Sequence, residues 1–266
     1  MLDYHVHTRY CRHASGEVKE YVIEGMNKGL KEIGISDHYP ISHLPQLSYN
    51  DYSMDLQEFP SYKREVNQLK KIFNSKIDVK LGAEVDYLKA EESTLRKNLA
   101  SEDVDYLIGV IHLLDNWIID DPRNTHKYLE YDLNAFYNKY FDEIQNLIRS
   151  GLFDIVGHID VIKKFNHIPE EGIEQYLMPC LESIADKELC LEVNTSGMDR
   201  PVKDTYPGKN FFKIMFDMGI QITLGSDAHQ PSEVGRHFEV ILKLLKNVGY
   251  SGLISFKNRE KELTKI

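Results

Sequence analysis

Short apolar runs alternate along this chain with longer segments in which apolar residues recur every three or four positions. Short runs rich in Val, Ile and Leu are typical of buried strands, whereas the wider spacing places apolar side chains on one face of a helix. The pattern predicts seven strands, at residues 2–6, 33–36, 79–85, 106–111, 153–156, 190–193 and 220–224.

Each predicted strand is followed by a connection long enough for a helix. Ser15 is a candidate N-cap for the first helix, in which Val18, Val22 and Met26 share one face. The other predicted helices lie at residues 59–73, around Leu95, and at 132–148, 173–184, 211–218 and 234–245. Because parallel strands need such crossovers, the repeated unit favours an α/β fold with a parallel barrel or a doubly wound sheet.

Two segments stand outside this repeat. Residues 40–60 form the longest irregular stretch, which carries Tyr49 and Tyr52. Long ordered loops in compact domains are often lids or binding loops, and a plain surface loop is the alternative. Residues 251–256 are apolar enough to add a small closing strand.

Histidines and carboxylates stand at the ends of the predicted strands. The C-terminal ends of parallel barrel strands open onto one face, so residues as distant as His5 and His229 are expected to converge there. Alternate residues of a strand point to the same side, so His5 and His7 can bind one ion. Imidazole is the commonest metal ligand in proteins. The candidate ligands are His5, His7, His13, His38, Glu84, His112, His158, Asp227 and His229.

Charge and composition narrow the classes of partner. The formal net charge of −10 disfavours a protein that binds nucleic acid by neutralising phosphates. The sequence has no apolar run of about 18 residues, the length typical of a membrane span. Three cysteines are too few for a disulfide framework and favour reduced thiols in the cytoplasm. Because the candidate ligands extend from His5 to His229, residues 1–266 are expected to form one domain, and a homo-oligomer is possible.

Six short motifs, in this order, resemble those of the polymerase and histidinol phosphatase (PHP) family. They are His5-Val6-His7, Ser36-Asp37-His38, Gly82-Ala83-Glu84, Gly109-Val110-Ile111-His112, Gly157-His158-Ile159-Asp160 and Ser226-Asp227-Ala228-His229. Further features resemble the histidinol-phosphate phosphatase branch of the family. These are Asn194-Thr195-Ser196-Gly197, Arg200, Trp117 soon after His112, and His229 followed by Pro231, Val234 and Gly235.

The resemblance implies a distorted (β/α)7 barrel with a metal site at the C-terminal ends of its strands. It implies three divalent ions, of zinc, iron or manganese. His5, His7, Glu84 and Asp227 would hold the first ion, and Glu84 would bridge to a second. The second ion would also take His112 and His158, and the third would take His13, His38 and His229. The activity implied is hydrolysis of a small phosphate monoester, L-histidinol phosphate, in histidine biosynthesis.

The implied mechanism is attack on phosphorus by a metal-bridging hydroxide, with Glu84 and Asp227 as catalytic ligands. Arg200 would donate to the phosphate. Lys163 either adds positive charge there, in place of the arginine common in relatives, or is a solvated helix residue. Asp160 either orients a ligand or protonates the leaving alkoxide. Trp117 and Asn194 are further candidate substrate contacts, whereas Met198-Asp199 before Arg200 departs from the family pattern.

Other functions remain open at this point. A PHP-type nuclease or phosphodiesterase and a phosphotyrosine phosphatase would use the same metals. A non-catalytic metal-binding module is a third alternative, although a structural zinc site needs only four ligands. Four histidines fit no motif and are expected at the surface or in packing contacts: His43, His126, His167 and His237.

Overall fold

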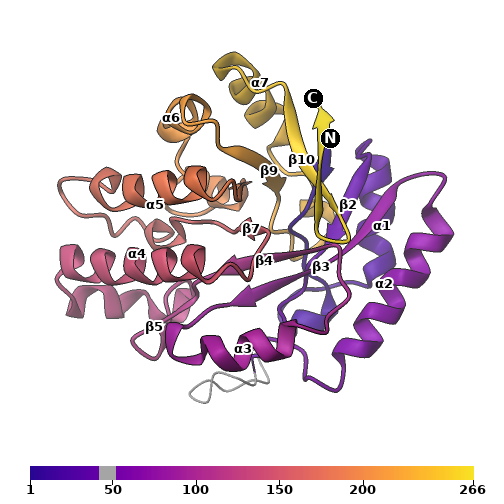
Figure 1. Ribbon diagram of the computed structural model, residues 1–266, viewed down its shortest axis with the longest axis horizontal. Coiled ribbons are helices and arrows are strands. Elements are labelled where there is room, and N and C mark those ends of the chain that lie inside the picture. The colour runs from indigo at the N-terminus through magenta and orange to yellow at the C-terminus, as the bar shows by residue number, and fades with distance from the viewer. Residues whose placement is uncertain (42–51) are drawn as a thin grey trace.

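A nearly closed barrel of seven parallel strands forms the centre of the molecule (Figure 1). The structure is a computed structural model that describes residues 1–41 and 52–266, so His43 and Tyr49 lie outside the described part. The strands follow chain order around the sheet: β1 (Leu2–Asp3), β2 (Glu32–Ile35), β3 (Asp78–Asp86), β4 (Tyr106–Val110), β7 (Ile155–Val156), β8 (Cys190–Asn194) and β9 (Gln221–Gly225). All seven predicted strands are therefore confirmed.

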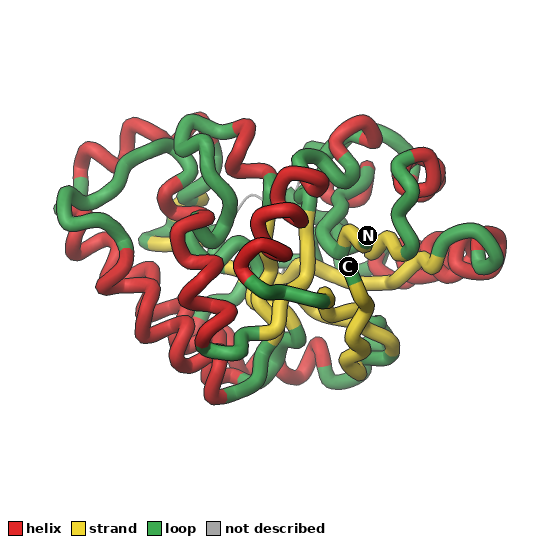
Figure 2. The backbone as a smooth tube through the Cα atoms, turned by 90° about the horizontal axis from the view of Figure 1, so that it is seen from above, coloured by secondary structure: helices red, strands yellow, loops and turns green. Residues whose placement is uncertain are grey.

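The two edge strands approach each other just beyond their ends. The amide of Tyr4 donates to the carbonyl of Leu224, and that of His7 donates to Ala228, both at 2.9 Å. These bonds bring the first and last ligand segments of the chain together. Figure 2 shows the strands at the centre with helices around them.

Seven α-helices of the described chain connect the strands along the outside: α1 (Val18–Asn27), α2 (Phe59–Phe73), α3 (Glu92–Leu99), α4 (Leu133–Ser150), α5 (Glu174–Asp186), α6 (Phe212–Asp217) and α7 (Phe238–Val248). The prediction of Ser15 as the first N-cap is wrong. The N-cap is Glu17, whose amide donates to the Glu20 carboxylate at 2.6 Å, while the Ser15 amide donates to the carbonyl of His229. Ser15 therefore ties the first loop to the last ligand segment.

Two small hairpins lie outside the barrel. One joins β5 (Leu113–Leu114) to β6 (Trp117–Ile118), and the sequence did not reveal it. The predicted strand at residues 251–256 exists as β10 (Gly252–Lys257), but it pairs antiparallel with β11 (Glu260–Lys265) rather than joining the barrel. The second hairpin covers the N-terminal end of the barrel, where Arg259 donates to Asp154 at 2.8 Å. The chain termini consequently lie close together (Figures 1 and 2).

Tyr106 fills the part of the barrel interior near the N-terminal ends of the strands. A Cβ atom on Gly34 would lie 2.1 Å from its hydroxyl oxygen, and one on Gly82 would lie 2.3 Å from its ring. The Tyr106 hydroxyl donates to the carbonyl of Tyr4 at 2.6 Å. Aromatic packing thus closes the N-terminal half, and the polar side chains occupy the C-terminal half.

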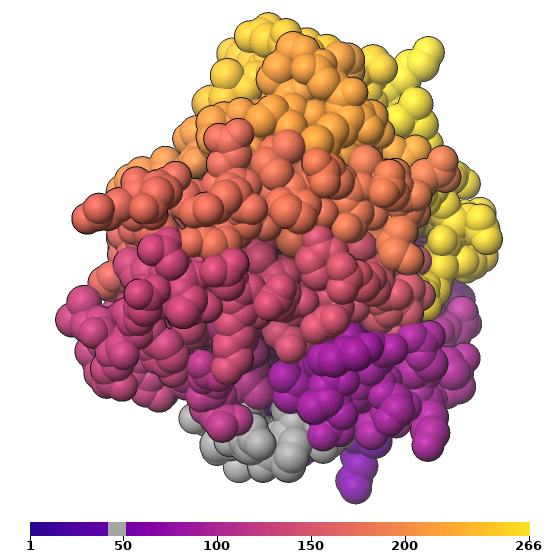
Figure 3. Space-filling model, turned by 60° about the vertical axis from the view of Figure 1, so that its left-hand side comes forward, coloured from indigo at the N-terminus to yellow at the C-terminus, as the bar shows by residue number. Residues whose placement is uncertain are grey.

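The surface reflects the same order of segments. In Figure 3 successive parts of the chain lie in bands, from the violet N-terminal third at the bottom to the yellow C-terminal part at the top. Among the described residues, no helix combines the length and apolarity needed to cross a membrane.

Candidate metal centre

All nine candidate ligands gather at the C-terminal end of the barrel. Glu84 lies within β3, and the others follow β1, β2, β4, β7 and β9 or the short turn after β1. They surround a cavity of about 910 Å³. Eight of them line it, and His5 lies fully buried behind them.

Three imidazole pairs face each other through their Nε2 atoms. The separations are 3.0 Å for His5 and His7, 3.2 Å for His112 and His158, and 3.0 Å for His13 and His229. Two nitrogens bound to one tetrahedral zinc, each at about 2.0–2.1 Å, lie about 3.3 Å apart. The pairs therefore have the spacing that ligands of a shared ion would have.

Glu84 lies at the middle of the group and is 1% exposed. Its Oε1 atom lies 2.9 Å from His158 Nε2 and 3.2 Å from His5 Nε2, while its Oε2 atom lies 2.9 Å from His38 Nδ1. Burial would raise the pKa of Glu84, but nearby His38, His5 and His112 hold it well below its usual value. This carboxylate is an anion with both oxygens directed at imidazoles.

Asp227 is the second carboxylate among the candidate ligands. Its Oδ1 atom lies 3.4 Å from His7 Nε2 and 4.0 Å from His5 Nε2. Burial opposes ionisation, but His5, His7 and His229 hold the pKa of Asp227 well below its usual value. Glu84 and Asp227 thus face the same pair of imidazoles.

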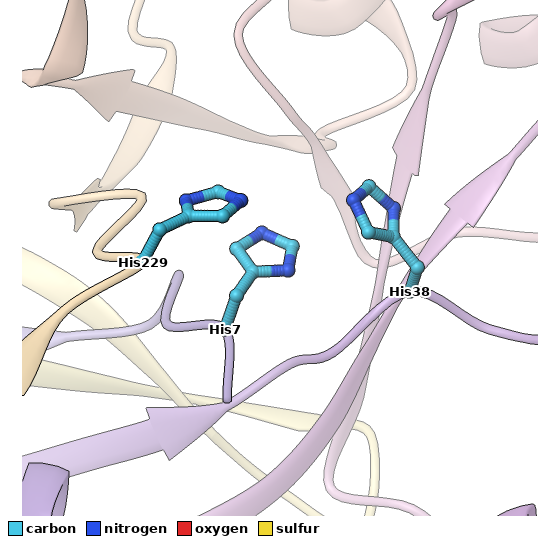
Figure 4. A group of neighbouring side chains, drawn as sticks. All are labelled: His7, His38 and His229. Carbon is cyan, nitrogen blue, oxygen red and sulfur yellow. The ribbon is translucent and has the colours of Figure 1, made fainter. Parts of the chain in front are cut away.

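His38 lies close to histidines that the resemblance assigns to two different ions. Its ring centroid is 4.6 Å from that of His7 and 5.4 Å from that of His13. Figure 4 shows His7 and His229 with their rings close together and His38 facing them from the other side. Donor atoms of these three residues lie within 4.8 Å of one another. The resemblance grouped His38 with His13 and His229, and the structure places it equally beside His7.

Several buried polar atoms of the centre have no hydrogen-bond partner within the described residues. They are Nδ1 of His7, Nδ1 of His158 and Oε2 of Glu84. Buried polar groups are nearly always paired, because an unpaired one costs about 1–3 kcal/mol. With Nε2 of these histidines directed at the shared ions, the two Nδ1 atoms are not the metal-binding nitrogens. The clustered Nε2 atoms around the Glu84 carboxylate fit a site for divalent cations, and this donor set suits zinc, iron or manganese better than magnesium or calcium.

Two supporting carboxylates were missed by sequence reasoning. Asp86 lies 3.0 Å from Nδ1 of His112, and Glu192 lies 2.7 Å from Nδ1 of His5. Carboxylates that accept from the outer nitrogen of a ligand histidine commonly fix its orientation. The signal was the strand period of two, because Asp86 shares a face with Glu84 and Glu192 shares one with Asn194.

Charged residues line the outer part of the cavity. Arg200 is present as expected, and its Nε atom is buried without a partner in the described chain. Lys164 also lines the cavity and pairs with Asp120 at 2.9 Å. Arg12 and Arg123 lie nearer the rim.

Lys163 and Asp160 are both buried and lie outside the cavity lining. Lys163 is 3% exposed, does not line the cavity and pairs with Asp160 at 2.7 Å. Asp160 is fully buried and also accepts from the amide of Gly208 at 3.2 Å. The pair therefore ties the turn after His158 to the segment that contains Gly208.

Trp117 and Asn194 also differ from expectation. Trp117 stacks on Phe136 at 5.5 Å between ring centroids and is absent from the cavity lining. Asn194 is fully buried, donates to Glu192 at 3.2 Å and accepts from the amide of Ser196 at 2.9 Å. Both side chains are held by protein contacts and do not line the cavity.

Comparison with known proteins agrees with the fold and the centre. Residues 3–196 match the PHP domain family. The "probable histidinol-phosphatase" of Deinococcus radiodurans is 35% identical over 98% of each chain. The histidinol-phosphatase of Lactococcus lactis is 26% identical over 96% of this chain and 94% of its own.

A solved structure resembles the whole barrel. It is histidinol phosphate phosphatase from Lactococcus lactis in complex with zinc, L-histidinol and phosphate. Its TM-score is 0.83 at 23% sequence identity, and the match covers 98% of both chains. The structural likeness shows the fold, and the family match over most of the chain with the 35% identical Deinococcus relative shows that the protein belongs to the PHP family.

Proposed function

We propose that this protein is a metal-dependent phosphatase that hydrolyses L-histidinol phosphate to L-histidinol and phosphate. The observation that carries the proposal is the cluster of nine metal-ligating side chains beside a cavity that also contains Arg200 and Lys164. The relatives named histidinol-phosphatase, aligned over nearly the whole chain, support this substrate. Residues 1–266 would act as one domain.

The residues fit three divalent ions. His5, His7, Glu84 and Asp227 would hold one, His112 and His158 would share Glu84 with a second, and His13, His38 and His229 would hold a third. When bound, such ions lower the pKa of a coordinated water and clamp phosphate oxygens. Zinc in the Lactococcus complex supports this metal among the three that the donors suit. Three dications offset by two carboxylates leave an excess of positive charge that favours a phosphate dianion.

The chain's own cations would orient the phosphate. Arg200 has a buried Nε atom free to donate, and a guanidinium can bind two phosphate oxygens at once. Lys164 would add a second charge, and its contact with Asp120 holds the ammonium group at the cavity wall. Lys164 therefore takes the role that the sequence assigned to Lys163.

Besides its cations, the cavity offers carboxylates to a leaving group that carries positive charge. Asp121, Asp199 and Glu233 line it, and the volume of about 910 Å³ exceeds that of phosphate alone. The hydroxyl of Tyr52 donates to Asp121 at 2.5 Å, which places an aromatic ring and a carboxylate side by side. The amine and imidazole of histidinol match these groups.

Phosphate release by the zinc-, iron- or manganese-reconstituted protein tests the proposal. L-histidinol phosphate would be compared with other monoesters, a phosphotyrosine peptide and a single-stranded oligonucleotide. Selective hydrolysis of L-histidinol phosphate is expected, and Asp227→Ala should abolish it. Cleavage of the oligonucleotide or another ester in preference would overturn the substrate. Metal binding without any turnover would indicate a non-catalytic module.

A further inference from the structure

Glu192 accepts hydrogen bonds from two ligand segments that follow different strands of the barrel. It lies on β8, is 1% exposed and does not line the cavity. Its Oε1 atom accepts from Nδ1 of His5 at 2.7 Å, and its Oε2 atom accepts from the backbone amide of His158, also at 2.7 Å. His5 follows β1 and His158 follows β7. One carboxylate thus contacts a ligand of each of two neighbouring proposed ions.

We propose that Glu192 is a positioning residue that fixes the tautomer of His5 and the backbone of His158, so that both imidazoles hold their ions. The inference rests on the proposed function for its activity readout, but its metal-binding readout is independent of substrate. Neither the ligand sets proposed above nor the six sequence motifs include this residue.

The contact with His5 determines which nitrogen is available to metal. A neutral imidazole has one N–H donor and one acceptor nitrogen. Because Nδ1 donates to Glu192, the lone pair lies on Nε2. That atom lies 3.2 Å from Glu84 and 4.0 Å from Asp227, the carboxylates proposed for the same ion. Glu192 therefore selects the tautomer of His5 that can bind metal.

The backbone around Glu192 leaves room for a carboxylate of this length. A Cβ atom on Gly225 would lie 1.9 Å from Glu192 Oε1 and 2.7 Å from His5 Cβ. A Cβ atom on Gly157 would lie 3.5 Å from Glu192 Oε2. Asn194 also donates to Oε1 at 3.2 Å. The carboxylate thus occupies space that the absence of a side chain on Gly225 leaves free, and three donors hold it.

Glutamine cannot replace this carboxylate, although its shape is nearly the same. If its amide nitrogen faced His5, Nδ1 would have to accept and the proton would move to Nε2, the metal side. If the amide were reversed, its nitrogen would face the amide of His158 and two donors would meet. Only a group with two acceptor oxygens satisfies both partners.

The experiment compares zinc binding by the wild-type protein and Glu192→Gln, with a chromophoric chelator as competitor and elemental analysis for stoichiometry. Loss of such supporting carboxylates typically weakens metal affinity roughly 10–100-fold. We expect that loss for at least one ion, together with a lower kcat and an unchanged KM for L-histidinol phosphate. Wild-type zinc affinity and kcat in the variant would overturn the proposal.

Asp154→Asn is the matched control. Asp154 is a largely buried carboxylate that accepts from the amide of Leu107 and from Arg259, both at 2.8 Å, at the opposite end of the barrel. It should lower the Tm without changing zinc binding, and an equal zinc loss in this control would overturn the proposal. If Glu192→Gln fails to fold, Glu192→Asp replaces it, since a shorter carboxylate cannot reach both partners. Full zinc affinity in the aspartate variant would then count against the proposal.

The two proposals fail separately. Wild-type protein that binds zinc but leaves L-histidinol phosphate intact would refute the proposed function. The comparison of zinc affinities between the wild type and Glu192→Gln would still decide the role of Glu192.

Discussion

Arg236 donates from Nη2 to the main-chain carbonyl of Asp227 at 2.7 Å, and from Nε to that of Ser226 at 2.8 Å. Asp227 has a φ of +51°, a left-handed conformation that costs a residue with a side chain about 1–3 kcal/mol. The guanidinium holds both carbonyls of this turn. Arg236 therefore stabilises the backbone that directs the Asp227 carboxylate towards His7.

Arg236→Met should weaken this turn. The Ser226 carbonyl would lose its donor, at a cost of about 1–3 kcal/mol of unfolding free energy if it stays buried. The Asp227 carbonyl would keep its contact with Nδ1 of His229 at 3.0 Å. Zinc affinity should fall as well, because Asp227 would no longer be held in place. Urea denaturation and zinc titration measure the two effects.

Arg259→Met provides the comparison for Arg236. Arg259 likewise donates to a carbonyl, that of Leu152 at 2.7 Å, and to the carboxylate of Asp154, but at the N-terminal end of the barrel. This variant should lose stability and keep its zinc affinity. Equal zinc affinity in the two variants would show that Arg236 has no special role at the centre.

Strand-end chemistry was readable from the sequence because a parallel barrel brings every C-terminal strand end to one face. The period of two within strands places His5 and His7 on one side of the first strand segment. Strand limits differ by one or two residues at most ends, and the core of each run is apolar enough to define it. The positions of histidines and carboxylates at successive strand ends were therefore enough to predict the ligand set.

Neighbouring residues with similar chemistry were not separable in this way. Lys163 and Lys164 follow the same motif, and the short turn at Val161–Lys163 directs one inwards to Asp160 and the other to the cavity. Trp117 lies in the β5–β6 hairpin and packs in the aromatic cluster around Phe136. These outcomes depend on local turns and tertiary packing that a linear pattern does not encode.

The two lysines should respond differently to substitution. Lys164→Met should reduce kcat/KM for the phosphate ester roughly 10–100-fold, because a hydrogen bond to a charged group contributes about 1.5–3 kcal/mol. It should lose less stability than Lys163→Met, because Asp120, the partner of Lys164, is 22% exposed whereas Asp160 is fully buried.

Lys163→Met should instead leave the Asp160 carboxylate buried without its cation, at a cost of about 3–5 kcal/mol of unfolding free energy. Steady-state kinetics and urea denaturation of both variants test this contrast. Reversed effects would return Lys163 to the phosphate site.

Metal uptake should depend on pH through the histidines that hold protons in the metal-free protein. Burial lowers the pKa of His5, but Glu192, Glu84 and Asp227 raise it well above its usual value. Burial also opposes protonation of His112, yet Asp86, Asp120 and Glu84 raise its pKa to about 10. Metal must displace both protons, so zinc affinity should increase as pH rises from below 6.5 towards 10.

Calorimetry in buffers of different ionisation enthalpy measures this proton release. Protons held by the ligand histidines, including His5 and His112, should be released when zinc binds at pH 7. The metal-free protein should show the opposite trend in stability. Raised folded-state pKa values stabilise it fully below the unfolded pKa of histidine, and this contribution is lost as pH rises through the folded values. Zinc binding without proton release would contradict the assignment of His5 and His112 as ligands.

Removal of metal should destabilise the whole barrel, because the ligands follow strands from β1 to β9 and one ion would join distant parts of the chain. A ligand at about 1,000 times its Kd stabilises the folded state by about 4 kcal/mol. For a domain of this size each kcal/mol shifts Tm by about 2–4 °C, so a chelator should lower Tm by about 8–16 °C. Differential scanning calorimetry of zinc-loaded and chelator-treated protein measures the shift. Asp227→Ala should show a smaller Tm difference between the zinc-loaded and chelator-treated protein, since one set of ligands is broken. An unchanged Tm on chelation of the wild type would mean that the strand ends do not share ions.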